Sequence, residues 1–206
     1  MQVLGRIARL CGTSKLDGVA AIVMEASLPA AKRRKSTARG ASRGRQKRKR
    51  EPRRGERIVA HTSSNLAIHL IFSTKARQPL IEPAFRADLF AYLGGIVREM
   101  QGAALIVNGT ANHVHLLLRI RPAQSVADVA RVIKANSSRW VRGKWSPHFA
   151  WQTGYGAFSV SESNTAAVMK YIAGQGDHHK KRSYQEEFVA FLKKNGIAYD
   201  ERHIWD

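Results

Sequence analysis

Two histidines separated by one residue, His113 and His115, are the first side chains of the sequence that suggest chemistry. They lie in residues 112–118 (NHVHLLL), an apolar run that follows a turn signal and predicts a β-strand. Side chains two apart in a strand project from the same face, so the two imidazoles can bind one divalent metal ion. Two ligands make an incomplete site, and an isolated pair of this kind is more often one core and one surface histidine.

A tyrosine and a glutamine four residues apart, Tyr171 and Gln175, lie in a predicted helix and share one of its faces. The amide oxygen of Gln175 suits a hard cation such as Mg²⁺ or Mn²⁺, and would complete the histidine pair as a three-residue site with open positions. A phenol has a pKa of about 10 and is a poor nucleophile until it is activated. A bound cation would lower the activation barrier for attack on a phosphodiester, because it polarises the phosphoryl oxygen. Taken singly, the two residues would be a half-buried tyrosine and a solvated glutamine.

The elements that must position these residues follow in a regular order. Strands are expected at residues 66–73, 103–107, 113–120 and 157–161, and helices beginning at residues 83, 126, 164 and 185. Ser125 is expected to cap the second helix. Asn108 and Gly109 should form the turn of a hairpin between the second and third strands. The order predicts an α+β fold: a ferredoxin-like, RRM-like β-α-β-β-α-β core with an additional C-terminal helix that bears the tyrosine. This architecture serves many functions.

Charge divides the 206 residues into two parts. Residues 1–60 carry 17 basic and 4 acidic residues, a net charge of +13, whereas residues 61–206 carry +7. The first part is predicted to be a basic, disordered extension, because it contains too few apolar residues to offset its ordering entropy. It would either follow phosphates as an arm or have no role. The second part is predicted to be one moderately basic domain, and both parts favour nucleic acid as a partner.

Cysteine content and hydropathy indicate the cellular compartment in which the protein is expected. A single cysteine, Cys11, forms no disulfide framework, which fits a reducing environment. The apolar run at residues 18–24 is too short for a membrane span, and no signal peptide is expected. The interpretation is a cytoplasmic protein without a membrane partner.

The combination of residues 113–115 (HVH) and 171–175 (YIAGQ) resembles the HUH single-tyrosine transposases of small bacterial insertion sequences, whose superfamily includes the REP-associated tyrosine transposases. Further similar stretches are 151–159 (WQTGYGAFS), 175–180 (QGDHHK), 186–188 (EEF) and 197–202 (IAYDER). The resemblance covers roughly residues 62–206. The basic extension has no counterpart in it.

The resemblance implies roles for four residues. His113 and His115 would be the metal-binding pair, Gln175 the third ligand of Mg²⁺ or Mn²⁺, and Tyr171 the nucleophile. The tyrosine would cut single-stranded DNA, keep the 5′ end as a phosphotyrosine and leave a free 3′ hydroxyl. The linkage preserves the energy of the phosphoester, so no nucleotide cofactor is expected, and the sequence contains no Gly-Lys-Ser/Thr phosphate loop. Family members bind imperfect DNA hairpins at element ends and act as homodimers.

Other residues are candidates for DNA contacts. The basic ones expected to contact phosphates are Arg77, Arg131, Lys134, Arg139 and Arg142. The aromatic ones that could stack on unpaired bases are Trp140, Trp145, Phe149, Trp151 and Tyr155, with packing favoured for Trp140 and Trp151. His178 and His179 could contact DNA or metal, but polar residues at a helix end are the preferred interpretation.

Three alternatives belong to other functional classes. A domesticated hairpin-binding protein without transposition activity could carry the same residues. A phosphoesterase of RNA ends would need two His-x-Thr or His-x-Ser motifs, and the sequence contains one such run, at residues 61–63 (HTS). An RNA-recognition module would need an aromatic pair on the sheet, which the predicted strands lack.

Overall fold

The computed structural model describes residues 22, 23, 63–179, 183–200, 202, 204 and 205. Apart from residues 22 and 23, the predicted basic extension at residues 1–60 lies outside this range. Among the helices described, none is both long enough and apolar enough to cross a membrane.

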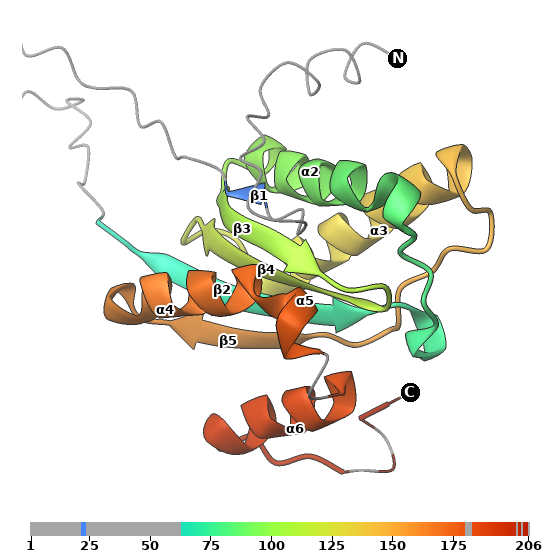
Figure 1. The fold of residues 1–206 in the computed structure, drawn as a ribbon. Coiled ribbons are helices and arrows are strands. Elements are labelled where there is room, and N and C mark those ends of the chain that lie inside the picture. Colours follow the sequence, from blue (N-terminus) through green and yellow to red (C-terminus); the bar gives the residue numbers. More distant parts are fainter. Residues whose placement is uncertain (1–21, 24–62, 180–182, 201, 203, 206) are drawn as a thin grey trace, which may run out of the picture. The chain divides into compact units, whose positions relative to one another are not determined.

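The described strands form one antiparallel sheet in the order β1-β3-β4-β2-β5 (Figure 1). Their bounds are β1 Ile22–Val23, β2 Leu66–Ser73, β3 Ala103–Gly109, β4 His113–Ile120 and β5 Gly156–Val160. The four longer strands have the spatial order of a ferredoxin-like core, in which the last strand pairs with the first. The expected fold class is therefore confirmed.

Two layers of helices enclose the sheet (Figure 1). The helices are α2 Pro83–Glu99, α3 Val126–Lys144, α4 Glu162–Ala173, α5 Gln175–His178 and α6 Tyr184–Lys194, with a 3-10 turn at Lys75–Arg77. Helices α2 and α3 cover one face, and α4 to α6 lie over the other.

Local sequence signals determine where several helices begin. A proline occupies the first turn of α2, where its missing N–H costs no hydrogen bond. Ser125 caps α3, as predicted, because its hydroxyl accepts from the backbone N–H of Asp128 at 3.0 Å. Helix α6 begins with a capping box formed by Ser183 and Glu186.

Alternation along β4 separates the core from the site. Val114, Leu116 and Leu118 pack into the main hydrophobic core beneath α2 and α3. His113 and His115 project to the opposite face, which confirms that they share one side of the strand. Each fully buried large apolar side chain of this core contributes about 1.5–3 kcal/mol, so the strand bearing the histidines is a rigid platform.

The predicted hairpin turn at Asn108 and Gly109 is wrong. Both residues belong to β3, where they pair with His115 and Val114, and the chain reverses at residues 110–112 instead. The tertiary structure overrides the local turn signal because the Asn108 side chain donates to the carbonyls of Ile172 at 2.8 Å and Ala173 at 3.1 Å. Asn108 thereby attaches β3 to the C-terminal end of α4.

Gly109 is expected to tolerate no side chain. A Cβ atom there would lie 2.2 Å from the carbonyl oxygen of His113 and 2.9 Å from the Cα of Val114. Gly109→Ala should therefore lower the free energy of unfolding by about 1–3 kcal/mol, because backbone atoms would have to move. Gly143→Ala in α3 is the matched control: its Cβ meets nothing within 4 Å, and alanine should stabilise the helix by up to about 1 kcal/mol. Equal urea-unfolding midpoints for the two variants would contradict this account.

Candidate active site

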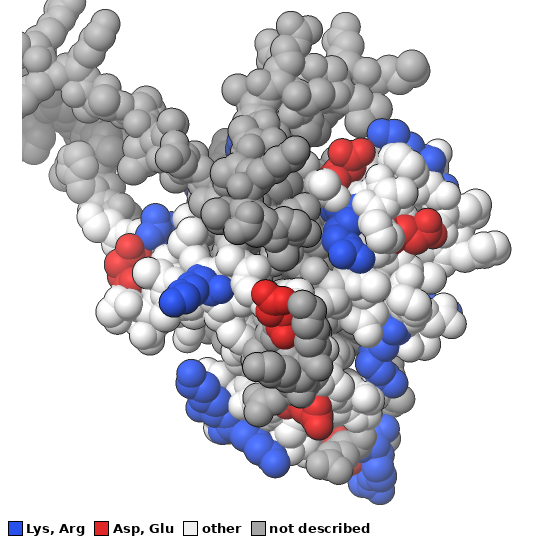
Figure 2. Space-filling model, viewed as in Figure 1, with Lys and Arg blue, Asp and Glu red and all other residues white. Residues whose placement is uncertain are grey.

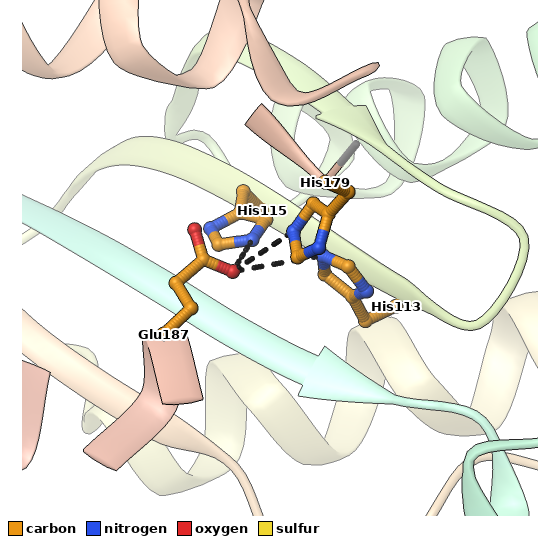
Figure 3. A group of neighbouring side chains, drawn as sticks. All are labelled: His113, His115, His179 and Glu187. Atoms are coloured by element: carbon orange, nitrogen blue, oxygen red, sulfur yellow. Dashed lines mark ion pairs between the residues drawn. The ribbon is translucent and has the colours of Figure 1, made fainter. Parts of the chain in front are cut away.

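Four side chains converge on the face of the sheet opposite α2 and α3: His113, His115, His179 and Glu187 (Figure 3). Two come from β4, one follows α5 directly, and Glu187 comes from α6. Their potential ligand atoms all lie within 4.8 Å of one another. Such a set of three imidazoles and one carboxylate can hold a divalent metal ion.

The imidazoles are arranged around one carboxylate oxygen. The Nε2 atoms of His179, His115 and His113 lie 3.0, 3.5 and 3.9 Å from Oε2 of Glu187. His113, His115 and Glu187 are buried, and the His179 side chain is 14% exposed. The cluster is thus shielded from most of the solvent.

Hydrogen bonds at the far side of each ring orient the two β4 histidines. Nδ1 of His113 donates to Oδ1 of Asn112 at 2.7 Å, so the lone pair of its Nε2 is directed at the cluster. Nδ1 of His115 lies 3.0 Å from Nε2 of His69, a buried residue on the neighbouring strand β2. Both β4 histidines therefore present Nε2 to the same point, in the manner of metal-ligating imidazoles.

The electrostatics of the cluster favour an added cation. Burial, and then the charges of His115 and His179, lower the pKa of His113 well below its ordinary value, which keeps the ring neutral. Burial raises the pKa of Glu187 to about 8, because it disfavours the charged carboxylate. The atoms His113 Nε2 and Gln175 Oε1 are both buried at the cluster. Neutral nitrogen donors, a buried carboxyl group and an amide oxygen at one point fit a divalent ion.

Gln175, the predicted third ligand, lies at the cluster and is fully buried. Its Nε2 donates to Oε1 of Glu187 at 3.1 Å, and its side chain is close enough to His113 to raise the pKa of that ring slightly against the effect of burial. The ligand role of Gln175 stays a prediction.

Sequence reasoning missed three contributors to the site. His179 was interpreted as a polar residue at a helix end, and it lies in the cluster instead; the side chain of His178 is outside the described set. Glu187 and His69 carried no spacing signal, because they are 72 and 46 residues away from His115 in the chain. The run QGDHHK was the one hint toward His179 that the sequence contained.

Tyr171 lies beside this cluster within its own subunit. Its ring centroid is 6.1 Å from that of His115 and 6.3 Å from that of His69, each in an edge-on arrangement. Tyr171 and Glu187 also line the same hollow, of about 490 Å³. The structure thus brings Tyr171 close to the cluster that contains His113 and His115, and the roles expected of these residues stay predictions.

Three of the five predicted DNA-contacting residues gather in a second hollow of about 460 Å³ along α3: Arg131, Lys134 and Arg142. Lys134 donates to the carbonyls of Thr153 and Gly154, both at 2.8 Å. Burial lowers the pKa of Lys134 to about 8.

Arg77 and Arg139 do not line that hollow. The Arg77 guanidinium lies 5.4 Å from the ring of Trp205 and donates to its carbonyl at 3.1 Å. Arg139 is exposed on α3.

Packing of two tryptophans is confirmed. Trp151 is buried and donates to Ser137 at 2.9 Å, and Trp140 stacks on Tyr92 with ring centroids 4.8 Å apart. Phe149 is also fully buried, whereas Trp145 and Tyr155 are exposed.

Comparisons with known proteins place the chain among the transposases, a class of enzymes that cleave and transfer DNA. Residues 62–175 match the family described as "Transposase IS200 like", and the chain belongs to this family. The family expected from the sequence is thereby confirmed.

Curated relatives agree with that assignment. The chain is 29% identical over 136 residues to the transposase for insertion sequence element IS200 of Salmonella typhimurium, covering 61% of this chain and 86% of the relative. It is 28% identical over 125 residues to the ISDra2 transposase TnpA of Deinococcus radiodurans, covering 54% and 85%.

Two solved structures are also similar. A crystal structure of a transposase from Deinococcus radiodurans has 26% identity and a TM-score of 0.46, covering 55% of this chain and 93% of the other. The structure of the REP-associated tyrosine transposase bound to a REP hairpin has 11% identity and a TM-score of 0.45, covering 58% and 73%.

Proposed function

We propose that this IS200-like transposase cleaves and rejoins single-stranded DNA at hairpin-flanked element ends through a 5′-phosphotyrosine intermediate on Tyr171. The observation that carries the proposal is the position of the Tyr171 ring beside His115, at the edge of a buried cluster whose donors fit a divalent cation. The resemblance of residues 113–115 and 171–175 to the HUH single-tyrosine enzymes supports the same chemistry.

The reaction requires one bond to form as another breaks. The phenolic oxygen of Tyr171 bonds to phosphorus, the bond from phosphorus to the 3′ oxygen breaks, and the 3′ oxygen leaves as a hydroxyl. The phenol proton passes to solvent or to a base, and the leaving oxygen takes up a proton. Attack by another 3′ hydroxyl reverses these steps and joins the strands without ATP.

The chain's own residues would hold the ion and the phosphate. His113 and His115, oriented by Asn112 and His69, would supply nitrogen ligands to Mg²⁺ or Mn²⁺. Gln175 would supply the amide oxygen, and we add His179 and Glu187 to this set on the basis of their place in the cluster. When bound, the ion would polarise the phosphoryl oxygen and stabilise the charge that develops on it.

The hollow along α3 is the proposed contact for hairpin phosphates. Arg131, Lys134 and Arg142 line it, together with the exposed ring of Tyr155. A lysine ammonium has three donors, and two of those on Lys134 are directed at carbonyls, which leaves one for a phosphate oxygen.

Hairpin affinity is expected to depend on pH through Lys134. Because its pKa is about 8, the side chain is charged below that pH and loses its charge above it. Binding of a hairpin should weaken roughly fivefold between pH 7 and pH 9, about 1 kcal/mol for one partly exposed charge pair. Lys134→Arg should remove this pH dependence, since a guanidinium stays charged. An equal decrease in the arginine variant, measured by fluorescence anisotropy, would show that Lys134 makes no such contact.

The experiment that tests the proposed function is detection of a covalent adduct. The protein is incubated with a hairpin that carries a single-stranded flank labelled on its 3′ side, with Mg²⁺, with Mn²⁺ or with EDTA. We expect the labelled fragment to migrate with the protein in a denaturing gel only when metal is present, and the released fragment to carry an extendable 3′ hydroxyl. Hairpin binding without any adduct in either metal would instead favour a domesticated hairpin-binding protein.

The homodimer is a further part of the proposal and rests on the resemblance alone. Light scattering of the full chain, with and without hairpin, would measure it.

A further inference from the structure

A hollow of about 490 Å³ opens beside Tyr171, between α4, β5 and α6. Its volume falls in the range of small-molecule binding sites. The roles assigned above involve Tyr171 and Glu187 in its wall, but none of the other residues that line it except His69.

One wall of the hollow is aromatic. Phe158 of β5 and Phe191 of α6 stack with their ring centroids 5.2 Å apart and their planes 25° from parallel. Phe191 also meets Tyr171 edge-on at 5.7 Å and His69 at 5.2 Å. The aromatic wall is therefore continuous with the tyrosine.

The remaining wall is mixed: Val160, Ala167, Val168 and Ala190 are apolar, and several polar residues lie among them. Asn164 at the start of α4, and Lys194 and Asn195 at the end of α6, line the hollow and are exposed. Asn195 is held in place because its Nδ2 donates to the Phe191 carbonyl at 2.9 Å, which leaves its Oδ1 available. Figure 2 shows basic side chains over α6, whose last turn carries two lysines.

We propose that this hollow binds the base of the nucleotide whose 5′ phosphate becomes joined to Tyr171. The inference rests on the proposed function and adds a subsite to it. After cleavage, that nucleotide remains covalently attached to the tyrosine, so its base can reach only the surroundings of Tyr171. An aromatic wall stacks on a base of any sequence, amide groups reach base edges, and Lys194 matches a phosphate.

Holding this base would serve the second half of the reaction. It would fix the phosphotyrosine in one orientation until another 3′ hydroxyl attacks. The hollow along α3 does not suit this task, since it is lined by none of Tyr171, Glu187 or His69.

The test is a scan of the single-stranded flank with the full-length protein. One abasic site, or one 2-aminopurine, is placed at each position in turn, and binding is measured by anisotropy and by 2-aminopurine fluorescence. We expect an abasic site directly 3′ of the cleaved bond to weaken binding roughly 5- to 150-fold, the effect of losing one base–aromatic stack. The 2-aminopurine at that position should be quenched on binding.

A variant that fills the hollow makes the test specific. Ala190→Phe places a ring into the hollow from α6, whereas Ala166→Phe, on an exposed part of α4 that does not line it, is the matched control. In Ala190→Phe, an abasic site directly 3′ of the cleaved bond should weaken binding no more than one elsewhere. In Ala166→Phe, it should weaken binding as much as in the wild-type protein.

Two results would overturn the inference. One is an equal effect of abasic sites at all positions in the wild-type protein. The other is an unchanged positional effect in Ala190→Phe. If the adduct on Tyr171 still forms in those cases, the proposed function stands and the base subsite fails. If no adduct forms with any DNA, the proposed function fails first, and the subsite with it.

Discussion

Replacement of Tyr171 by phenylalanine is expected to abolish the covalent protein–DNA adduct, by at least about 1000-fold, because the nucleophilic oxygen is removed. Hairpin affinity should change by less than about twofold. The phenylalanine ring can keep the edge-on contacts that Tyr171 makes with His115 and Phe191, so the fold and the cluster should be preserved. Denaturing gels measure the adduct, and anisotropy measures the affinity.

A matched control separates this effect from a general loss of tyrosine. Tyr92 lies in α2, on the other side of the sheet, and stacks on Trp140. Tyr92→Phe should form the adduct at the wild-type rate. An adduct in Tyr171→Phe, or its loss in both variants alike, would remove Tyr171 from the role of nucleophile.

Replacement of Glu187 by glutamine is expected to remove most of the stabilisation that a divalent metal gives to the fold. A ligand at 100 times its dissociation constant stabilises the native state by about 2.7 kcal/mol. Loss of the only charged ligand should weaken binding at least about 100-fold, because even outer-shell partners are worth 10- to 100-fold. At the same metal concentration the stabilisation would then fall to about 0.4 kcal/mol. Urea unfolding with Mn²⁺ and with EDTA measures both values.

The metal-free fold should tolerate this substitution. Burial raises the pKa of Glu187 to about 8, so the charged carboxylate is already disfavoured there and a neutral amide of the same shape fits. Glu162→Gln, at an exposed carboxylate that pairs with Arg119, is the control and should keep the full metal effect. Glu187→Gln could instead keep the metal-dependent stabilisation while Gln175→Ala loses it. That result would favour the three-ligand set predicted from the sequence over the four-residue cluster as the metal site.

The sequence by itself determined the parts of the site that depend on local periodicity. Alternation along residues 113–120 placed both β4 histidines on one face, because a strand repeats every two residues. Helical spacing predicted Tyr171 and Gln175 one turn apart in a single helix, and this is wrong in detail: α4 ends at Ala173, and Gln175 begins the separate helix α5. The order of strands and helices was enough to predict the ferredoxin-like core.

Only the tertiary structure decided which distant residues complete the site. His69 meets His115 through the register of β2 against β4, and Glu187 reaches the cluster because α6 packs against β2 and β5 through Phe188. His179 depends on α5, a helix of four residues that no periodic pattern can predict. The same packing overrode the turn signal at Asn108, whose side-chain amide donates a hydrogen bond to the carbonyl of Ile172 in α4. Local spacing fixes directions within one element, whereas distances of a few ångströms between elements depend on how their buried faces pack.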